Sequence, residues 1–454
     1  MPSELNAISP LDGRYYERVK EFSPIFSESA LMRYRLWVEI EYLIGLSREP
    51  KVHELAPFSE AQIKQLRALY QKFSEADAKR VKQIEKITDH DVKALEYFAK
   101  EKLKKVLPPG IFEFFHSGLT SEDINNIAYS LMLKDGIGIY LKSVARILAE
   151  LKGLALKHKN LAMLSLTHSQ PATPTTLGHE MAVFYSRVKR QVEKLSAIKL
   201  TAKFSGATGN WSAHTVSYPN VDWINSSKKF VESFGLEFLP LSTQIEPHDT
   251  SVEVYQAISR VNTVIRDFNQ DIWLYILRKL FKQKLVKGEI GSSTMPHKIN
   301  PWYFENSEGN ITIANGILHA LSDRLPVSRL QRDLSDSTML RNQGMALGYS
   351  MLAVKSTLIG LSKLDVDKNA IKKELEENPQ VIAEAVQTVL RKVGYPKPYE
   401  AVKALTRGKI VNLASMRKFI QKLKIPSIEK KKLLKLTPEK YTGLAGKLVE
   451  KYLK

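Results

Sequence analysis

The chain has 454 residues, of which 43% are hydrophobic and 26% charged, a balance that indicates a folded protein of more than one domain and excludes a disordered chain. It has no cysteine, so disulfides, thiolate metal sites and cysteine nucleophiles are excluded, and its glycine and proline contents disfavour a turn-rich all-β fold. The formal net charge of +20 favours anionic partners, such as nucleic acid, an anionic surface or an anionic substrate.

The N-terminal sequence is polar and lacks the apolar core of a signal peptide. No uninterrupted apolar stretch of about 18 residues occurs, so we expect no membrane-spanning helix and a cytoplasmic location. Pro108-Pro109-Gly110 interrupts the helical pattern, and we place the N-terminal helical domain at residues 1–118.

Helical periodicity dominates the rest of the chain. From Val254 to Tyr275 the apolar residues alternate at steps of four and three, the heptad pattern of a long bundle helix. Similar stretches cover residues 125–157, 175–203, 306–321 and 342–364. The sequence therefore predicts an all-α, three-domain chain, with a central bundle domain at 119–364 and a basic helical domain at 365–454.

The charge excess is concentrated at the C-terminus. Residues 401–454 hold 15 Lys and Arg against 3 Asp and Glu, an excess of 12 positive charges. We interpret this block as a solvated helical surface. Nucleic-acid binding is the alternative, but no recognised motif interleaves aromatic residues with these charges.

Polar residues crowd into four segments where a bundle would place apolar ones. In 291–301, three hydroxyls follow a glycine, and then come a lysine, an asparagine and two prolines that prevent helix continuation. Such a loop can surround one anion, although a serine-capped linker is the alternative. The other three segments are 167–174, 116–123 and 88–91. In 167–174 a lone histidine is more often structural than catalytic. Segment 116–123 resembles a helix N-cap, which is also a possible anion site. No metal-ligand spacing, P-loop or dinucleotide-binding motif occurs, so no metal or cofactor is predicted.

The segment GSSTMPHKINP at 291–301 resembles the signature loop of the fumarase/aspartase superfamily, whose members release fumarate from substituted succinates. Along its whole length the chain is similar to the long bacterial type of the adenylosuccinate lyase family. The segments that carry this narrower resemblance are DGRY, HDVKA, HSGLTSEDINN, THSQPATP, TQIEPHD, FENSEGN and SDSTMLRN.

This resemblance implies a homotetramer with active sites shared between subunits, anionic nucleotide substrates and no cofactor. The implied reaction is β-elimination of fumarate, from adenylosuccinate to give AMP and from the succinylaminoimidazole carboxamide ribonucleotide to give its free carboxamide (AICAR), in purine biosynthesis. Another fumarate-releasing lyase, such as an argininosuccinate lyase, is the alternative within the superfamily. A non-catalytic structural homologue is a further alternative, but the intact Ser292, His168 and Lys298 argue against it.

The resemblance also implies a role for each site residue. Ser292 is the base, with Ser293 as the competing candidate, and His168 is the general acid, held by Glu305. The implied phosphate-binding residues are Arg14, Tyr15, Arg332, Ser337 and Arg341. The implied carboxylate-binding residues are Thr120, Ser121, Lys298 and Asn300. The other implied substrate-binding residues are Asp89, His90, Asp91, Gln244, Asn306 and Thr338.

Overall fold

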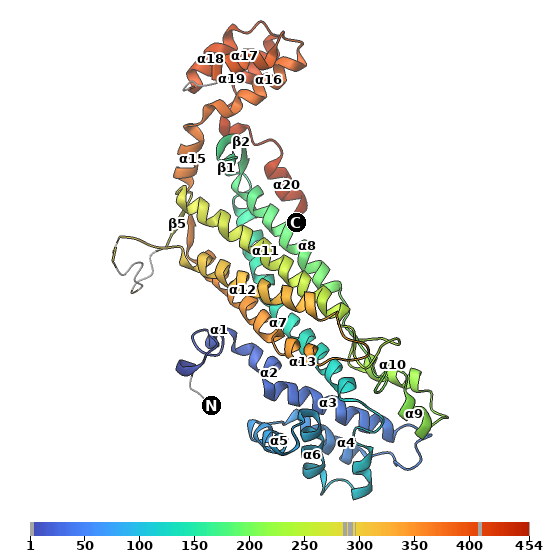
Figure 1. Ribbon diagram of the computed structural model, residues 1–454. Helices are drawn as coiled ribbons and strands as arrows, with labels where there is room; N and C mark the ends of the chain where they lie inside the picture. Colours follow the sequence, from blue (N-terminus) through green and yellow to red (C-terminus); the bar gives the residue numbers. More distant parts are fainter. Residues whose placement is uncertain (1–3, 285–287, 289–293, 296, 407–410, 454) are drawn as a thin grey trace. The chain divides into compact units, whose positions relative to one another are not determined.

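The computed structural model describes residues 4–284, 288, 294–295, 297–406 and 411–453, and long helices dominate it (Figure 1). The longest are α7 (Ser121–Lys157), α8 (Leu177–Ala197), α11 (Asp249–Leu277), α12 (Trp302–Arg324) and α14 (Gln343–Ser362). They confirm the predicted all-α fold. Each long helix corresponds to a stretch predicted from periodicity, although α8 ends before residue 203.

Shorter helices precede the bundle. They are η1 (Glu4–Asn6), α1 (Tyr16–Val19), η2 (Lys20–Phe22), α2 (Ser23–Phe26), α3 (Glu28–Ser47), α4 (Glu60–Gln71), α5 (Glu75–Thr88), α6 (Asp91–Leu103) and η3 (Pro109–Phe114). Helices α4 and α5 each begin with a capping box, in which Ser59 or Ser74 satisfies backbone donors that the helix leaves unpaired. Three more short helices lie further along the chain: α9 (Ser212–Ser217), α10 (Trp223–Ser233) and α13 (Ser335–Leu340).

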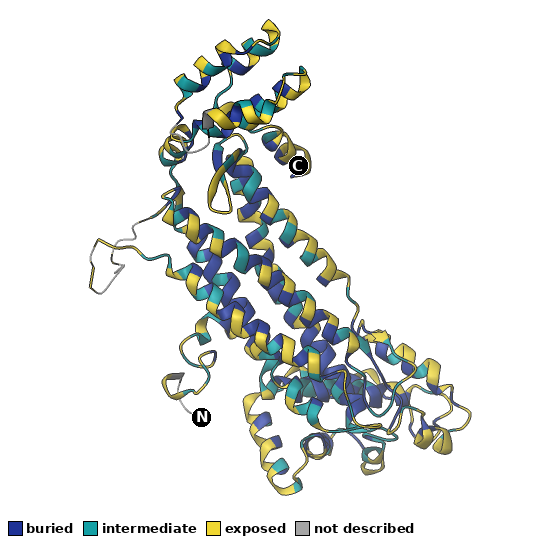
Figure 2. Cartoon of the chain, turned by 45° about the horizontal axis from the view of Figure 1, so that its top comes forward, coloured by how far each residue is buried: buried dark blue, intermediate teal, exposed yellow. Residues whose placement is uncertain are grey.

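The heptad seam of α11 is buried as predicted. Its positions from Val254 to Ile272 are at most 1% exposed, and Tyr275 is 7% exposed. Along α8 and α12 buried residues alternate with exposed ones, whereas residues 346–354 of α14 are buried all round (Figure 2). Within the described part of the chain, Ser335–Ser362 is the one helical stretch apolar and long enough to cross a membrane, and 78% of its apolar window is buried, as in the core helix of a globular protein.

The C-terminal helices enclose a hydrophobic core. They are α15 (Lys368–Glu376), η4 (Pro379–Ile382), α16 (Ala383–Lys392), α17 (Pro398–Thr406), α18 (Leu413–Lys422), α19 (Ser427–Leu434), η5 (Pro438–Lys440) and α20 (Ala445–Tyr452). Leu433 of α19 belongs to this core, and Leu434 and Leu436 pack against it. The adjacent Lys431, Lys432 and Lys435 are exposed, as expected for a solvated basic surface.

Short strands form three two-stranded sheets in the described residues: β1 (Ala162–Thr167) antiparallel to β2 (Gln170–Thr176), β3 (Thr201–Ala202) parallel to β4 (Glu237–Phe238), and β5 (Phe281–Gln283) antiparallel to β6 (Leu364–Val366). The β1–β2 hairpin contains the polar segment 167–174, and β2 leads directly into α8. It is anchored by Leu164, which is buried in the C-terminal core.

The chain divides into two compact units. Unit 1 comprises residues 1–143, 191–263 and 309–355, and unit 2 comprises 144–190, 264–308 and 356–454. Both units draw on segments that are far apart in the sequence, because the boundaries fall inside or beside the long helices. The three-domain division remains a proposal based on sequence.

Candidate active site

In unit 1, helix α7 begins at the predicted carboxylate-binding pair Thr120 and Ser121. The Asp123 side chain accepts a hydrogen bond from the Thr120 backbone N–H at 2.9 Å, which is one half of a capping box. No described residue hydrogen-bonds to the Thr120 or Ser121 hydroxyl. These two hydroxyls, at the N-terminus of a 37-residue helix, are therefore available to bind an anion.

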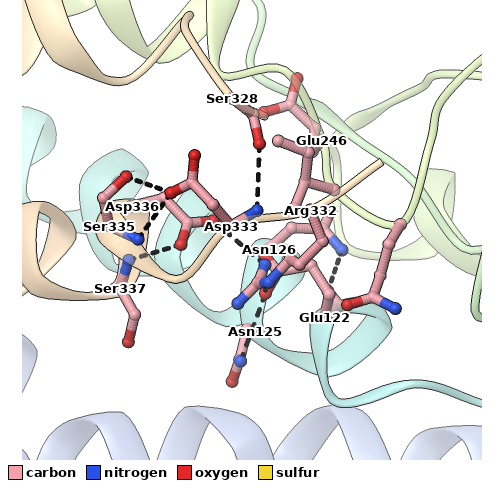
Figure 3. Close-up of polar contacts among 12 residues, drawn as sticks. Glu122, Asn125, Asn126, Glu246, Ser328, Arg332, Asp333, Ser335, Asp336 and Ser337 are labelled. Carbon is pink, nitrogen blue, oxygen red and sulfur yellow. Dashed lines mark hydrogen bonds and ion pairs between the residues drawn. The ribbon is translucent and has the colours of Figure 1, made fainter. Parts of the chain in front are cut away.

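Arg332 is held by two carboxylates on separate elements (Figure 3). Its Nη1 lies 2.8 Å from Glu122 Oε2 on α7 and 3.1 Å from Asp336 Oδ2 on α13. Asp336 also accepts a hydrogen bond from the Ser337 backbone N–H at 2.6 Å. One acidic side chain thus links Arg332 and Ser337, two of the predicted phosphate-binding residues.

A buried histidine and a third carboxylate extend this cluster. His248 Nε2 lies 3.6 Å from Asp336 Oδ2, and its Nδ1 lies 3.6 Å from Glu246 Oε2. Burial raises the pKa of Glu122 and of Glu246, while the Arg332 and His248 charges respectively oppose the rise. Burial would lower the pKa of His248, but the surrounding carboxylates outweigh it and raise that pKa.

The resemblance implies no role for Glu122, Glu246, His248 or Asp336, although all four belong to the quoted motifs. Each is at most 7% exposed. The sequence signal that could have found these four residues is an ionisable side chain next to a predicted site residue in the same motif. Which of these side chains meet one another depends on tertiary contacts between α7, α13 and the 243–248 loop.

A second charged group forms around Asp91, also in unit 1. Its carboxylate lies 2.8 Å from Arg35 Nη1 and 3.2 Å from Arg341 Nη2, and Arg341 Nη1 lies 2.7 Å from Glu28 Oε2. Burial would raise the pKa of Asp91, but the two guanidinium groups outweigh it and lower that pKa below its ordinary value. The structure thus brings together the predicted residues Asp91 and Arg341.

Arg341 also lines a cavity of about 260 Å³ together with Asp12 and Tyr16 of the N-terminal segment. Two predicted residues, Arg14 and Tyr15, lie between these two lining residues in the sequence. The Arg14 guanidinium is 5.9 Å from the Tyr15 ring centre. Thr338 is exposed. The predicted phosphate-binding residues Arg14 and Arg341 therefore belong to neighbouring parts of one unit.

The predicted residues Asp89 and His90 join α5 to α6. Asp89 ends α5 with a left-handed φ of 49°. His90 is the N-cap of α6, and its Nδ1 accepts a hydrogen bond from the Lys93 backbone N–H at 3.1 Å. Because Nδ1 is an acceptor, a neutral His90 carries its proton on Nε2.

In unit 2, His168 occupies the tip of the β1–β2 hairpin. Thr167 pairs with Gln170, so the loop has two residues, His168 at φ 52° and Ser169 at φ 60°. Left-handed backbone at two consecutive non-glycine residues is uncommon, and such strain concentrates at functional sites. The His168 side chain is exposed and has no partner among the residues described.

The predicted base falls in the signature loop, where Ser292 and Ser293 lie outside the described residues. The backbone carbonyl of Ile299 accepts a hydrogen bond from Gln283 Nε2 at 2.8 Å, which ties the end of the loop to β5. Lys298 is exposed and Asn300 is half-buried.

The remaining predicted residues of unit 2 are on α12. Glu305 accepts a hydrogen bond from Trp273 Nε1 at 3.1 Å, and Asn306 Oδ1 accepts one from Ser356 Oγ at 2.7 Å. No contact joins Glu305 to His168 in the part of unit 2 that the structure describes. The predicted support of His168 by Glu305 is therefore not made within one unit.

Gln244, the last predicted residue, lies in unit 1, and its Nε2 donates to the Ala207 carbonyl at 2.9 Å.

The comparisons with known proteins cover the whole chain. It is 48% identical over 451 residues to the adenylosuccinate lyase of Haemophilus influenzae and 46% identical over 450 residues to that of Escherichia coli K12, with 99% of both chains covered in each case. Residues 13–316 match the lyase family, and residues 328–442 match the adenylosuccinate lyase C-terminal family. The chain belongs to the adenylosuccinate lyase family.

Solved structures share the fold of this adenylosuccinate lyase family member at low sequence identity. A fumarate lyase from Mesorhizobium sp. BNC1 has a TM-score of 0.76 at 18% identity, covering 96% of this chain and 97% of that one. The 3-carboxy-cis,cis-muconate lactonizing enzyme from Pseudomonas putida has a TM-score of 0.73 at 20% identity, covering 96% of both. These likenesses show the fold, and the family membership makes the chain a lyase.

In this family member, His116 lies beside Glu39, with Nδ1 2.6 Å from Oε1. Burial would lower the pKa of His116, but the carboxylate outweighs it and raises that pKa above its ordinary value. The charged pair therefore stabilises the fold fully below about pH 6.5, and its contribution is lost as the pH rises through the folded-state pKa. We expect the Tm deficit of His116→Gln to be largest at about pH 6 and to shrink toward about pH 9. A deficit that does not change with pH in calorimetry would contradict this pairing.

Proposed function

We propose that this chain eliminates fumarate from adenylosuccinate, leaving AMP, and from the succinylaminoimidazole carboxamide ribonucleotide, leaving the free carboxamide. The single observation that carries the proposal is full-length identity of 46–48% to adenylosuccinate lyases of two bacteria. We place the reaction in the cytoplasm.

The chemistry requires a base, an anion site and an acid. Removing the Cβ proton of the succinyl group places extra negative charge on the adjacent carboxylate, which preorganised donors must stabilise. The C–N bond then breaks, and the departing nitrogen takes a proton from a general acid. In our proposal, Ser292 accepts the Cβ proton, Lys298 with Asn300 and Asn306 binds the succinyl group, and His168 protonates the nitrogen.

The second carboxylate of the succinyl group is assigned to the start of α7. The unpaired hydroxyls of Thr120 and Ser121, next to N-terminal N–H groups, are suited to this role because they present several donors from a fixed backbone. Gln244, Asp89, His90 and Asp91 are assigned to the nucleotide portion of the substrate.

The phosphate is assigned to Arg14, Tyr15, Arg332, Ser337 and Arg341, and Thr338 is assigned to substrate binding beside them. Guanidinium groups bind phosphate through paired N–H donors, and the carboxylates that hold Arg332 and Arg341 fix the direction of those donors. This phosphate site is the feature that distinguishes a nucleotide substrate from argininosuccinate.

We propose that the active enzyme is a homotetramer whose sites combine residues of three subunits. Large apolar side chains are exposed along the long helices: Val183 on α8, Leu274 and Leu277 on α11, and Ile313 on α12, between 42% and 65% exposed. In the proposed tetramer, packing between the long helices of different subunits would cover these side chains. A subunit interface would also provide partners for the exposed His168, including a Glu305 from another subunit.

The basic C-terminal block should affect substrate capture and not chemistry. Replacing Lys430, Lys431, Lys432 and Lys435 with Gln should leave kcat within about twofold of the unmodified value, because salt screens such charges over about 8–10 Å. Any loss in kcat/KM should appear at low salt and fade as salt increases. A large loss of kcat that persists at high salt, with helix content and oligomeric state intact, would contradict this.

The substrate assignment is tested by measuring fumarate release from adenylosuccinate and from argininosuccinate side by side. We expect turnover of adenylosuccinate and none of argininosuccinate above background. Preferred turnover of argininosuccinate would replace the proposal with the related activity. Release of fumarate from neither substrate would favour a non-catalytic homologue.

A further inference from the structure

Helix α7 holds the neighbouring segment 201–206 through three polar side chains on one face. Asn126 Nδ2 donates to the Lys203 carbonyl at 3.1 Å, while its Oδ1 accepts from the Lys203 N–H at 2.9 Å. Ser130 Oγ donates to the Thr201 carbonyl at 3.2 Å. The third side chain, Asp123, meets the end of the segment. These contacts add to the pairing of β3 with β4 and hold the backbone of the segment against α7.

Asp123 is the centre of a closed network of donors. Its carboxylate accepts hydrogen bonds from the backbone N–H groups of Thr120, Ser205 and Gly206, at 2.9 to 3.1 Å for the closest contact of each. It also lies 2.8 Å from Lys203 Nζ, and both side chains of this ion pair are 0% exposed. The pair lies wholly inside unit 1, without contact with solvent.

A buried ion pair is weak evidence for stability, because taking two charges out of water costs about as much as their attraction returns. Its distinctive effect is geometric, since a fully satisfied charged network tolerates few alternative arrangements. The groups that Asp123 and Lys203 fix should therefore indicate what the pair is for.

The backbone groups that Asp123 and Lys203 bind belong to, or lie next to partners of, two predicted substrate-binding residues, Thr120 and Gln244. On one side, Asp123 binds the backbone of Thr120. On the other, Lys203 Nζ donates to the Gly206 carbonyl at 2.8 Å, and Gly206 has a left-handed φ of 78°. The next carbonyl, that of Ala207, accepts the 2.9 Å hydrogen bond from Gln244 Nε2. This bond engages one Nε2 hydrogen of Gln244 and orients the amide, so its Oε1 and its second Nε2 hydrogen remain for a ligand.

We propose that Asp123 and Lys203 form a positioning pair that fixes Thr120 and the Gln244 amide in one arrangement for the substrate. Neither residue touches the substrate in this proposal. Asp123 acts through the Thr120 backbone and through Gly206, and Lys203 acts through Gly206 and the Ala207 carbonyl. The inference rests on the proposed function, because Thr120 and Gln244 are substrate-binding residues only in that reading.

Asp123→Asn should lower kcat/KM by about 10- to 100-fold, because displacement of binding groups by about 1 Å has effects of this size. Asparagine keeps the shape of the side chain but cannot accept from all four donors and does not neutralise Lys203. The double variant Asp123→Asn with Lys203→Met removes both charges. We expect it to recover Tm relative to Lys203→Met alone without recovering kcat/KM. Recovery of both together would reduce the pair to a structural role.

A double-mutant cycle identifies the route of the effect. In a Gln244→Ala background, Asp123→Asn should cost markedly less in kcat/KM than in the unmodified protein, because the group it positions is already absent. The matched control is Asn262→Leu, which disturbs another fully buried polar network of unit 1, with Tyr140, Asn315 and Ser350. Its effect should add to that of Gln244→Ala. If the effect of Asp123→Asn on kcat/KM also simply adds to that of Gln244→Ala, the proposal is overturned.

Hydrogen exchange gives a readout that does not depend on turnover. Asp123→Asn should speed exchange of the Thr120, Ser205 and Gly206 amides, whereas Asn262→Leu should not. Unchanged exchange at these three amides would overturn the positioning pair, whatever the activity. Absence of fumarate release from the unmodified protein, with the expected exchange pattern, would count against the proposed function alone.

Discussion

Replacing Ser292 with alanine should lower turnover of adenylosuccinate by about 10³-fold or more, because alanine cannot accept the Cβ proton. The hydroxyl acts mainly in the transition state, so the fall should appear in kcat, with substrate binding and Tm nearly unchanged. Fumarate release under saturating substrate gives kcat, and calorimetry of the folded protein gives Tm.

Ser293→Ala is the matched control, since it removes the same group one position along the loop. It should retain most of the activity. If Ser293→Ala instead carries the loss while Ser292→Ala keeps near-native turnover, the base is Ser293. If neither variant loses more than about tenfold, the proton is taken by a group outside this loop pair.

Mixing two inactive variants should restore activity. His168→Ala and Ser292→Ala, denatured together and refolded, should form hybrid tetramers in which some sites contain neither substitution. If the two residues of each site come from different subunits, random assembly at equal concentrations leaves roughly one quarter of the sites intact. The measurement is fumarate release before and after co-refolding, with each variant refolded alone as the control.

The shared-site proposal would be wrong if hybrids form but activity stays at the level of the separate variants. Hybrid formation is checked with a charge tag on one variant, which separates the mixed tetramers by ion exchange. The His168→Ala and Glu305→Gln pair extends the test, because we assign these two side chains to different subunits as well.

The long helices were predictable because their signal is periodic and extends over many turns. Between Val254 and Tyr275 the heptad pattern left one register for burial, and α11 buries those positions. Amphipathic patterning is a local property that the fold then satisfies.

The β1–β2 hairpin was not predictable in the same way. Its two-residue loop uses His168 and Ser169 in left-handed conformations, where the usual hairpin signal is glycine or asparagine. Pro171 and Pro174 lie in the second strand, and prolines in a strand normally argue against that assignment. Tertiary anchoring through Leu164 outweighs these local preferences.

Motifs indicated which residues to propose for the site, but not which side chains meet. Nothing in the sequence pairs Glu122 with Arg332, because the two residues are 210 positions apart. The engagement of Glu305 by Trp273 and of Gln244 by the Ala207 carbonyl likewise depends on packing between elements. Sequence patterns can therefore suggest chemical types, while partners and orientation require the fold.

The proposed release of fumarate from adenylosuccinate is tested most directly by the stoichiometry of the reaction. The purified protein is incubated with adenylosuccinate, and AMP and fumarate are quantified by chromatography over time. A parallel incubation with the His168→Ala variant controls for contaminating lyases. The account predicts equal amounts of AMP and fumarate from the unmodified protein and a strongly reduced rate from the variant. No release of either product, or equal rates from the two proteins, would contradict it.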